Sequence, residues 1–145
     1  MSGIQILATC NDVALIQFTT TSFPSNFDLY YIGYDASNTD PNGSCGVHHP
    51  AGDYKMISCQ DTDSLVYSNG IVWTVQTWDF GTTEGGPSGS PLIDEGTRQM
   101  VGVASTVDTC TNNNPCGSCT TRTNYGKLLS CWTNSLKPFI LGSGD

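Results

Sequence analysis

Charged residues are scarce in this sequence, and basic residues are the scarcest. Only 12% of the 145 residues are charged, and 5 Lys and Arg against 13 Asp and Glu give a formal net charge of −8. An average domain has about 25% charged residues. Proteins bind nucleic acids through basic side chains that neutralise phosphates, so this balance excludes such a role. It also argues against docking on anionic membrane surfaces.

Long hydrophobic runs are missing as well. The longest apolar runs, such as residues 13–16, are far shorter than the roughly 20 residues that cross a bilayer, so no transmembrane helix is expected. Residues 1–9 contain no Lys or Arg and no long apolar core, so we do not expect them to be a signal peptide.

Most apolar residues of the sequence fall in short segments with a period of two. The length fits one domain of about 150 residues. Candidate strands span residues 3–8, 13–18, 29–34, 46–48, 54–58, 65–67, 71–77, 90–93, 99–105 and 125–129. Strands spaced this way, with no helical pattern between them, predict an all-β antiparallel barrel or sandwich. One short helix is expected near the C-terminus over residues 135–141, with Asn134 as its N-cap and Gly142 after its end.

Seven cysteines are many for this length, and the odd number leaves one without a partner inside the chain. The composition predicts a secreted or extracellular protein with disulfide bonds. Cys45 and Cys59 are candidates for one pair, although the connectivity does not follow from the sequence. We interpret Cys110, Cys116 and Cys119 as disulfide partners in a surface loop, because neither a redox helix nor a second zinc-binding pair accompanies them.

Residues 84–92, Glu-Gly-Gly-Pro-Ser-Gly-Ser-Pro-Leu, are the most informative segment. Glycines around Ser88 allow a sharp turn that exposes the hydroxyl and lets backbone N–H groups converge on one point, as in an oxyanion hole. An isolated Gly–Ser loop with no chemistry would have the same sequence. The nucleophile elbow of α/β-hydrolases is excluded, because it needs Gly where Ser90 stands and a later His, and no His follows residue 49.

Asp12 opens the apolar run 13–18, and the Gly-x-Ser-Gly-x-Pro pattern follows far later in the chain. With these two motifs the sequence resembles the trypsin-like (chymotrypsin-fold) serine endopeptidases, and most closely their bacterial lysyl-endopeptidase branch. Matching stretches are residues 12–16, 31–35, 47–50, 55–58, 84–92, 101–103, 125–127 and 130–132.

The resemblance implies the Greek-key double-barrel fold, with the second barrel present and the first mostly missing. Residues 1–22 would be a remnant of the first barrel and a linker, and residues 23–145 the second barrel with the nucleophile loop. By the same resemblance Ser88 is the nucleophile, the backbone N–H groups of Gly86 and Ser88 form the oxyanion hole, and Asp12 orients the catalytic imidazole. The implied substrate-pocket and substrate-pairing residues are Thr82, Thr123 and Ser105.

The catalytic histidine should precede Asp12, but none of the eleven residues before Asp12 is a His. The resemblance therefore implies a fragment with little activity alone, acting on a peptide or protein substrate once the N-terminal half supplies the imidazole. His48 and His49 allow the subtilisin order Asp, His, Ser, but a Ser among β signals argues against that alternative. Adjacent histidines also suit no common zinc spacing, so neither metal nor other cofactor is expected.

Three departures from the family bear on activity and specificity. Pro87 replaces the Asp that trypsins use in activation, Thr82 replaces their basic-specific Asp, and Thr123 replaces the Asp of the lysyl branch. A lysine preference is therefore unsupported, and a small or polar pocket is expected. The alternatives are a non-catalytic peptide- or protein-binding pseudo-protease module, and a small structural secreted domain without a site. A single barrel should also expose an apolar patch where the other barrel would pack.

Overall fold

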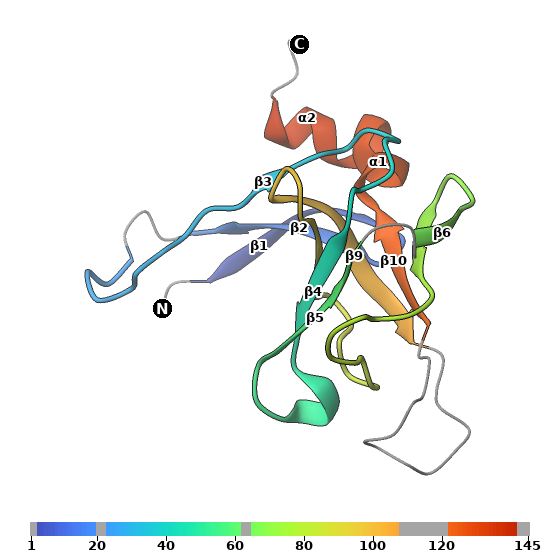
Figure 1. The fold of residues 1–145 in the computed structure, drawn as a ribbon. Coiled ribbons are helices and arrows are strands. Elements are labelled where there is room, and N and C mark those ends of the chain that lie inside the picture. The colour runs from blue at the N-terminus through green and yellow to red at the C-terminus, as the bar shows by residue number, and fades with distance from the viewer. Residues whose placement is uncertain (1–2, 20–22, 62–64, 108–121, 142–145) are drawn as a thin grey trace.

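The computed structural model describes residues 3–19, 23–61, 65–107 and 122–141, which form two β-sheets and a C-terminal helix (Figure 1). The small sheet is a hairpin of β1 (Ile4–Cys10) and β2 (Val13–Phe18). The large sheet has eight strands in the order β5-β4-β8-β9-β10-β7-β6, with β3 beside β9. Its strands are β3 (Gly33–Tyr34), β4 (Ser44–His48), β5 (Met56–Gln60), β6 (Leu65–Ser68), β7 (Val72–Val75), β8 (Pro91–Asp94), β9 (Gln99–Val107) and β10 (Thr123–Lys127).

The all-β prediction is confirmed, because the large sheet is antiparallel apart from the β3–β9 pair and curls into a half-barrel. Every candidate strand has a counterpart in the structure. The run 29–34 was predicted too long, since only Gly33 and Tyr34 pair, with Gln99 and Met100. Residues 29–32 are exposed and have no ladder partner among the described residues, so their apolar and aromatic character alone does not make a strand.

The C-terminal helix begins earlier than predicted. It consists of α1 (Leu128–Cys131), a π-helical turn η2 (Trp132–Leu136) and α2 (Lys137–Ile140). Asn134 lies exposed inside the π turn and does not cap the helix, so the predicted start there was wrong. Burial of Leu128 and Leu136 against the hairpin, rather than a local capping signal, positions the helix. No helix in the described residues is long and apolar enough to span a membrane.

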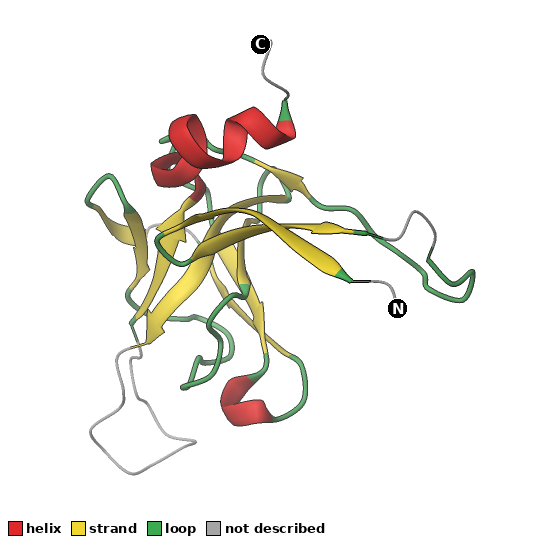
Figure 2. Ribbon diagram, turned by 180° about the vertical axis from the view of Figure 1, so that it is seen from behind, coloured by secondary structure: helices red, strands yellow, loops and turns green. Residues whose placement is uncertain are grey.

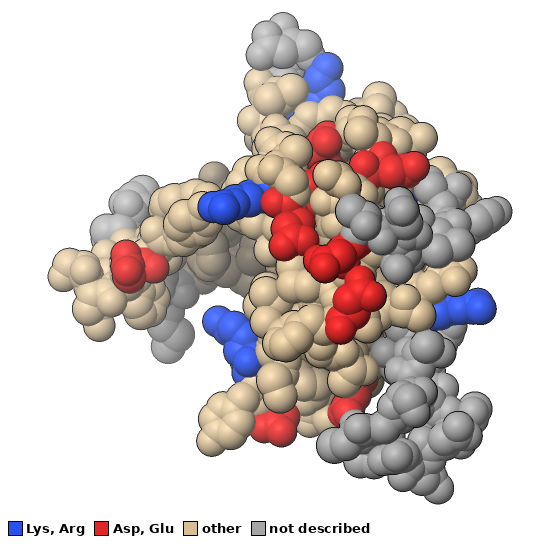
Figure 3. Space-filling model, in the orientation of Figure 1, with Lys and Arg blue, Asp and Glu red and all other residues tan. Residues whose placement is uncertain are grey.

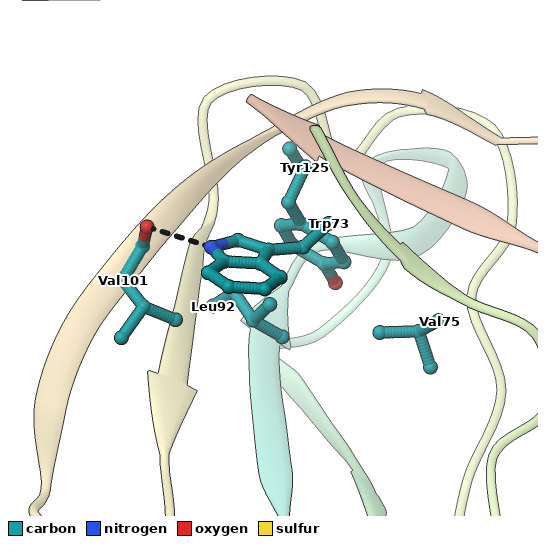
Figure 4. Close-up of a cluster of buried hydrophobic side chains, with 6 residues drawn as sticks. Trp73, Val75, Leu92, Val101 and Tyr125 are labelled. Carbon is teal, nitrogen blue, oxygen red and sulfur yellow. Dashed lines mark hydrogen bonds between the residues drawn. The ribbon is translucent and has the colours of Figure 1, made fainter. Parts of the chain in front are cut away.

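The core of the large sheet is built around two aromatic side chains (Figure 4). Trp73 and Tyr125 pack with Val75, Leu92 and Val101, and the Trp73 indole N–H donates to the Val101 carbonyl oxygen at 3.2 Å. The Tyr125 hydroxyl is buried without a hydrogen-bond partner in the described structure, and burial raises its pKa above the usual value.

Gly46 in β4 makes room for that hydroxyl. A Cβ atom added at Gly46 would lie 2.6 Å from Tyr125 Oη and 3.4 Å from the Trp78 ring. Close approach between β4 and the buried ring therefore requires a residue without a side chain here.

Lys127 connects the end of β10 to the segment before β4. The side chain is almost fully buried, with Nζ 3.5 Å from the Trp73 ring centroid and donating to Asn38 Oδ1 at 2.7 Å. Burial lowers the pKa of Lys127, and the charge of Asp40 opposes that shift. The cation–π contact and the hydrogen bond compensate the desolvated charge, so this lysine stabilises the fold.

Acidic side chains gather in a band over β4 and β5 on the face drawn in Figure 3, with few basic side chains among them. A surface of this kind attracts cationic groups and repels other polyanions.

The hairpin β1–β2 projects from the side of the large sheet, with the N-terminus at its outer end (Figure 2). Val13 packs with Leu128, Cys131 and Leu136 of the helix at the hairpin's inner end. Toward the outer end, cross-strand pairing places four apolar side chains on one face, 42% to 61% exposed. These four residues, called the outer apolar face below, are Ile4, Ile6, Ile16 and Phe18.

The contact between Gly46 and Tyr125 gives a double-mutant test of the core. We expect Gly46→Ala to lower the free energy of unfolding by about 2 kcal/mol, because the added methyl overlaps the hydroxyl. Tyr125→Phe alone should change it by less than about 1 kcal/mol, since the removed hydroxyl makes no hydrogen bond. Combined with Gly46→Ala it should restore most of the loss. Urea unfolding measures all three, with Gly85→Ala as control because a Cβ there meets nothing within 4 Å. Equal losses with and without Tyr125→Phe would contradict this account.

Candidate functional site

Ser88 lies at the second position of a tight turn over residues 87–90, and its side chain is exposed. The Ser90 N–H donates to the Pro87 carbonyl oxygen at 2.9 Å, and Gly89 has a φ of +86°, which favours glycine. Two further bonds attach the turn to β9. The Gly89 N–H donates to the Ala104 carbonyl oxygen at 2.9 Å, and the Ala104 N–H donates to the Ser90 carbonyl oxygen at 2.8 Å. The sheet therefore fixes the backbone on which the hydroxyl stands.

Two backbone N–H groups beside this hydroxyl are open to a ligand. In the described part of the chain, the N–H groups of Gly86 and Ser88 have no hydrogen-bond acceptor, and both residues are exposed. Unpaired backbone donors are rare in folded proteins, because most are satisfied by the protein or by water. A carbonyl oxygen that becomes negatively charged is the kind of acceptor that such a pair of donors stabilises.

The loop after β4 contacts the backbone of residues 85 and 86. The Ala51 N–H donates to the Gly85 carbonyl oxygen at 2.8 Å. A Cβ at Gly86 would lie 3.2 Å from Ala51 N and 3.3 Å from the His49 carbonyl oxygen, and Gly86 has a φ of +114°. Both the close approach and the backbone conformation therefore require glycine at position 86.

Both histidines bind backbone oxygens. His48 is buried, and its Nε2 lies 3.1 Å from the Thr82 carbonyl oxygen, so the ring carries its proton on Nε2. Its Nδ1 is buried without a partner in the described structure. His49 Nδ1 lies 3.0 Å from the Asp53 carbonyl oxygen. These contacts hold the two rings against neighbouring backbone in the loop after β4.

Thr123 lies on β10 and meets Thr83 rather than Thr82. The hydroxyls of Thr83 and Thr123 are hydrogen-bonded to one another, both side chains are fully buried, and Trp78 Nε1–H donates to Thr83 Oγ1 at 3.1 Å. The side chain of Thr82 is exposed, while its carbonyl oxygen accepts from His48 and from Ser58 Oγ–H at 2.7 Å. The sequence analysis named Thr82, and its neighbour Thr83 is the residue that contacts Thr123. In the sequence, the only indication was that Thr83 carries the same hydroxyl as its neighbour Thr82.

Ser105 lies on β9 just beyond its pairing with β8. The register of β8 along β9 ends at Val103, and Ala104 bonds to the 87–90 turn instead. From Ser105 onward the described chain pairs with β9 only through β10, on the opposite edge. The edge that faces away from β10 is therefore open at Ser105, as a strand that receives an extended peptide must be.

Asp12 lies exposed in the two-residue turn between β1 and β2. Its neighbour Asn11 has a φ of +49°, and Asn11 Nδ2 donates to Ser130 Oγ at 3.5 Å. Within the described residues, no hydrogen bond or ion pair joins Asp12 to the Ser88 turn. The β1–β2 turn instead contacts the C-terminal helix through Asn11.

The described residues contain two disulfides, one within a pair of neighbouring strands and one between the two ends of the chain. The expected pair Cys45–Cys59 is confirmed and joins β4 to β5. The second bridge, Cys10–Cys131, connects the hairpin to the helix and was not predicted. The predicted disulfide partners Cys110, Cys116 and Cys119 lie outside the described residues. Among the residues that are described, no group of three or more His, Cys, Asp or Glu side chains forms a metal site.

One comparison with known proteins identifies a family for this chain. The family model for the lysyl endopeptidase C-terminal domain matches residues 1–121, which include the hairpin, the Ser88 turn and β9. A comparison with curated proteins finds no match. Since the matched region covers most of the chain, this protein belongs to the lysyl endopeptidase C-terminal domain family.

Proposed function

We propose that this chain is the nucleophile-bearing part of a serine endopeptidase, which cleaves peptide bonds through an acyl-enzyme. The observation that supports it most is the exposed Ser88 hydroxyl beside two N–H groups that have no acceptor in the described part of the chain, on a turn bonded to β9. Membership of a protease family supports the same reaction class. In this proposal residues 1–22 are the remnant of a first barrel with its linker, and residues 23–145 form the second barrel.

The roles follow from the chemistry of acyl transfer. Ser88 Oγ attacks the scissile carbonyl carbon while its proton passes to an imidazole. The carbonyl oxygen accepts hydrogen bonds from the N–H groups of Gly86 and Ser88. The imidazole returns the proton to the leaving amine, and water then hydrolyses the acyl-enzyme. Asp12 orients that imidazole. Neither His48 nor His49 supplies it, because both rings bind backbone oxygens.

The imidazole therefore comes from an N-terminal half of the enzyme, which we propose docks on the outer apolar face of the hairpin. Its four side chains are apolar and substantially exposed, as the residues of an interface core are before the partner binds. Two disulfides and the family relation support a secreted protein. A serine without its base is a weak nucleophile.

Substrate preference would depend on the buried Thr83–Thr123 pair and on Ser105. The pair is uncharged, which favours a small or polar side chain at the cleaved position over lysine. Thr82, the other predicted pocket residue, has an exposed side chain, and its carbonyl oxygen accepts hydrogen bonds from His48 and Ser58. The open edge at Ser105 would pair with the substrate backbone.

A non-catalytic peptide-binding module is the second candidate. The engagement of both histidines favours it, because the chain then offers a peptide-binding edge and an oxyanion site without a base. Substrate analogues would bind such a module and would not be cleaved.

Labelling by a fluorophosphonate tests the nucleophile. We expect the 145-residue chain to react slowly with the probe, since removing triad groups leaves only roughly 10³–10⁴-fold catalysis over the reaction in water. Addition of a lysyl-endopeptidase N-terminal half that carries the His should raise the labelling rate at least about tenfold. Mass spectrometry locates the label, and Ser88→Ala is the control that should abolish it. Rapid labelling of the chain alone would disprove the need for a second half, and no acceleration by that half would favour the binding module.

Thr123→Asp tests the proposed substrate pocket. A buried, unpaired carboxylate should lower the melting temperature, because desolvating it costs free energy. Benzamidine, a cation that fits a basic-specific pocket, should restore stability by about 2.7 kcal/mol at a concentration 100 times its Kd. Calorimetry measures both effects. Thr133→Asp places the same charge on the exposed side of the helix and should show neither. Destabilisation without a benzamidine response would mean that Thr123 does not line a ligand pocket.

A further inference from the structure

Three neighbouring strands of the large sheet carry a row of buried polar side chains at one end. Ser44, the first residue of β4, pairs with Gln60 at the end of β5 and with Asp94 at the end of β8. Residues directly opposite one another point to the same face of a sheet. All three side chains are buried, and Asp94 is only 8% exposed. A buried carboxylate needs a cation or several hydrogen bonds to compensate its charge.

The Asp94 carboxylate has little such compensation. Its Oδ1 accepts the N–H of Thr97 at 3.0 Å, and no ion pair joins Asp94 to a basic side chain within the ranges that the structure describes. Arg98 of the same turn has an exposed side chain, and its backbone N–H donates to the Asp94 carbonyl oxygen at 2.8 Å. A carboxylate can accept about four hydrogen bonds, so most of its capacity is open to a ligand.

The side-chain amide of Gln60 supplies a second acceptor in the same row. Its Nε2 donates to Ser44 Oγ at 3.1 Å, which directs the amide from β5 over β4, toward the strand that carries Asp94. The side chain is fully buried, and Oε1 has no hydrogen-bond partner among the described residues. A buried acceptor without a donor is explained by strain, by water or by an ion. Beside a carboxylate that lacks a counter-charge, a cation accounts for both groups.

Two turns bring further oxygens to this end of the sheet. A Cβ atom added at Gly43, just before β4, would lie 3.1 Å from Glu95 Oε2 and 3.4 Å from the Gln60 carbonyl oxygen, so these two oxygens are close to one another. A Cβ atom added at Gly96, just after β8, would lie 3.2 Å from Asp94 Oδ1. Glu95 is exposed, so its carboxylate lies on the solvent side of the buried row.

We propose that this end of the sheet binds a calcium ion. The residues of this strand-end site are Ser44, Gln60, Asp94 and Glu95. Carboxylate, amide and hydroxyl oxygens are the ligands that Ca²⁺ prefers, whereas transition metals favour imidazole or thiolate. Two carboxylates with neutral oxygens suit a weak site, in the range of about 10⁻⁴–10⁻³ M found for extracellular calcium-binding modules.

The bound ion connects β5 and β8 across the start of β4, and it stabilises this end of the sheet because only the folded chain brings the three strands together. The acidic band over β4 and β5 attracts the cation to this face (Figure 3). The loop that contacts residues 85 and 86 follows the other end of β4. The strand-end site is therefore separate from the Ser88 turn, and calcium binding does not depend on the proposed reaction.

Calorimetric titration of the full chain with calcium chloride, at about 0.15 M sodium chloride to screen diffuse attraction, tests the site. We expect one ion per chain, and magnesium chloride should bind at least about tenfold more weakly because Mg²⁺ gives up its water reluctantly. Asp94→Asn keeps an acceptor for the Thr97 N–H and removes the charge, so it should raise the Kd for calcium at least about tenfold. Asp28→Asn is the matched control, which removes a charge from the exposed segment before β3 and should leave the Kd unchanged.

Gln60→Glu gives a gain of affinity that a folding defect cannot imitate. The added carboxylate should lower the melting temperature without calcium, and calcium should then bind more tightly and raise the melting temperature further than in the unmodified chain. Three results would each overturn the strand-end site. They are an unchanged Kd in Asp94→Asn, equal stabilisation by calcium and magnesium, and no heat of binding up to about 10 mM calcium, well above the range of such sites.

Discussion

The hydrogen bonds between the 87–90 turn and Ala104 are the constraint on which the candidate site depends. They convert a flexible Gly-Pro-Ser-Gly sequence into a fixed extension of β9. Because the turn occupies the edge of β9 at Ala104, pairing with β8 stops there, and no other described segment pairs with that edge from Ser105 onward. One local arrangement thus exposes the hydroxyl and leaves two N–H groups without an acceptor among the described residues.

The His-His-Pro loop has a supporting role around this turn. Ala51 holds the Gly85 carbonyl oxygen, and the ring of His48 holds that of Thr82, on either side of Thr83 and Glu84. A carbonyl that accepts two hydrogen bonds, here from His48 and Ser58, is fixed more firmly than one with a single donor. Both rings contact backbone oxygens and His48 is also buried, so the histidines support the geometry of this loop.

The hairpin gives the molecule its asymmetry. Its inner end packs on the helix through Val13 and is bonded through Cys10, whereas its outer end presents Ile4, Ile6 and other apolar side chains to solvent. Packing of this kind is stable where a second surface covers the apolar side chains. The same hairpin thus fixes the position of Asp12 at its inner end and exposes apolar side chains at its outer end.

The sequence by itself determined the fold class, because period-two apolar segments and turn residues encode strands locally, and it identified the Ser88 turn through its glycines. It also named Cys45 and Cys59 correctly, since they flank one short loop. Only the tertiary structure decided that Thr83 rather than Thr82 meets Thr123, because adjacent residues of an irregular loop differ in direction only through the contacts that hold the loop. The helix start at Leu128 and the Cys10–Cys131 bridge were likewise decided by packing between the two ends of the chain, and no local sequence pattern records such contacts.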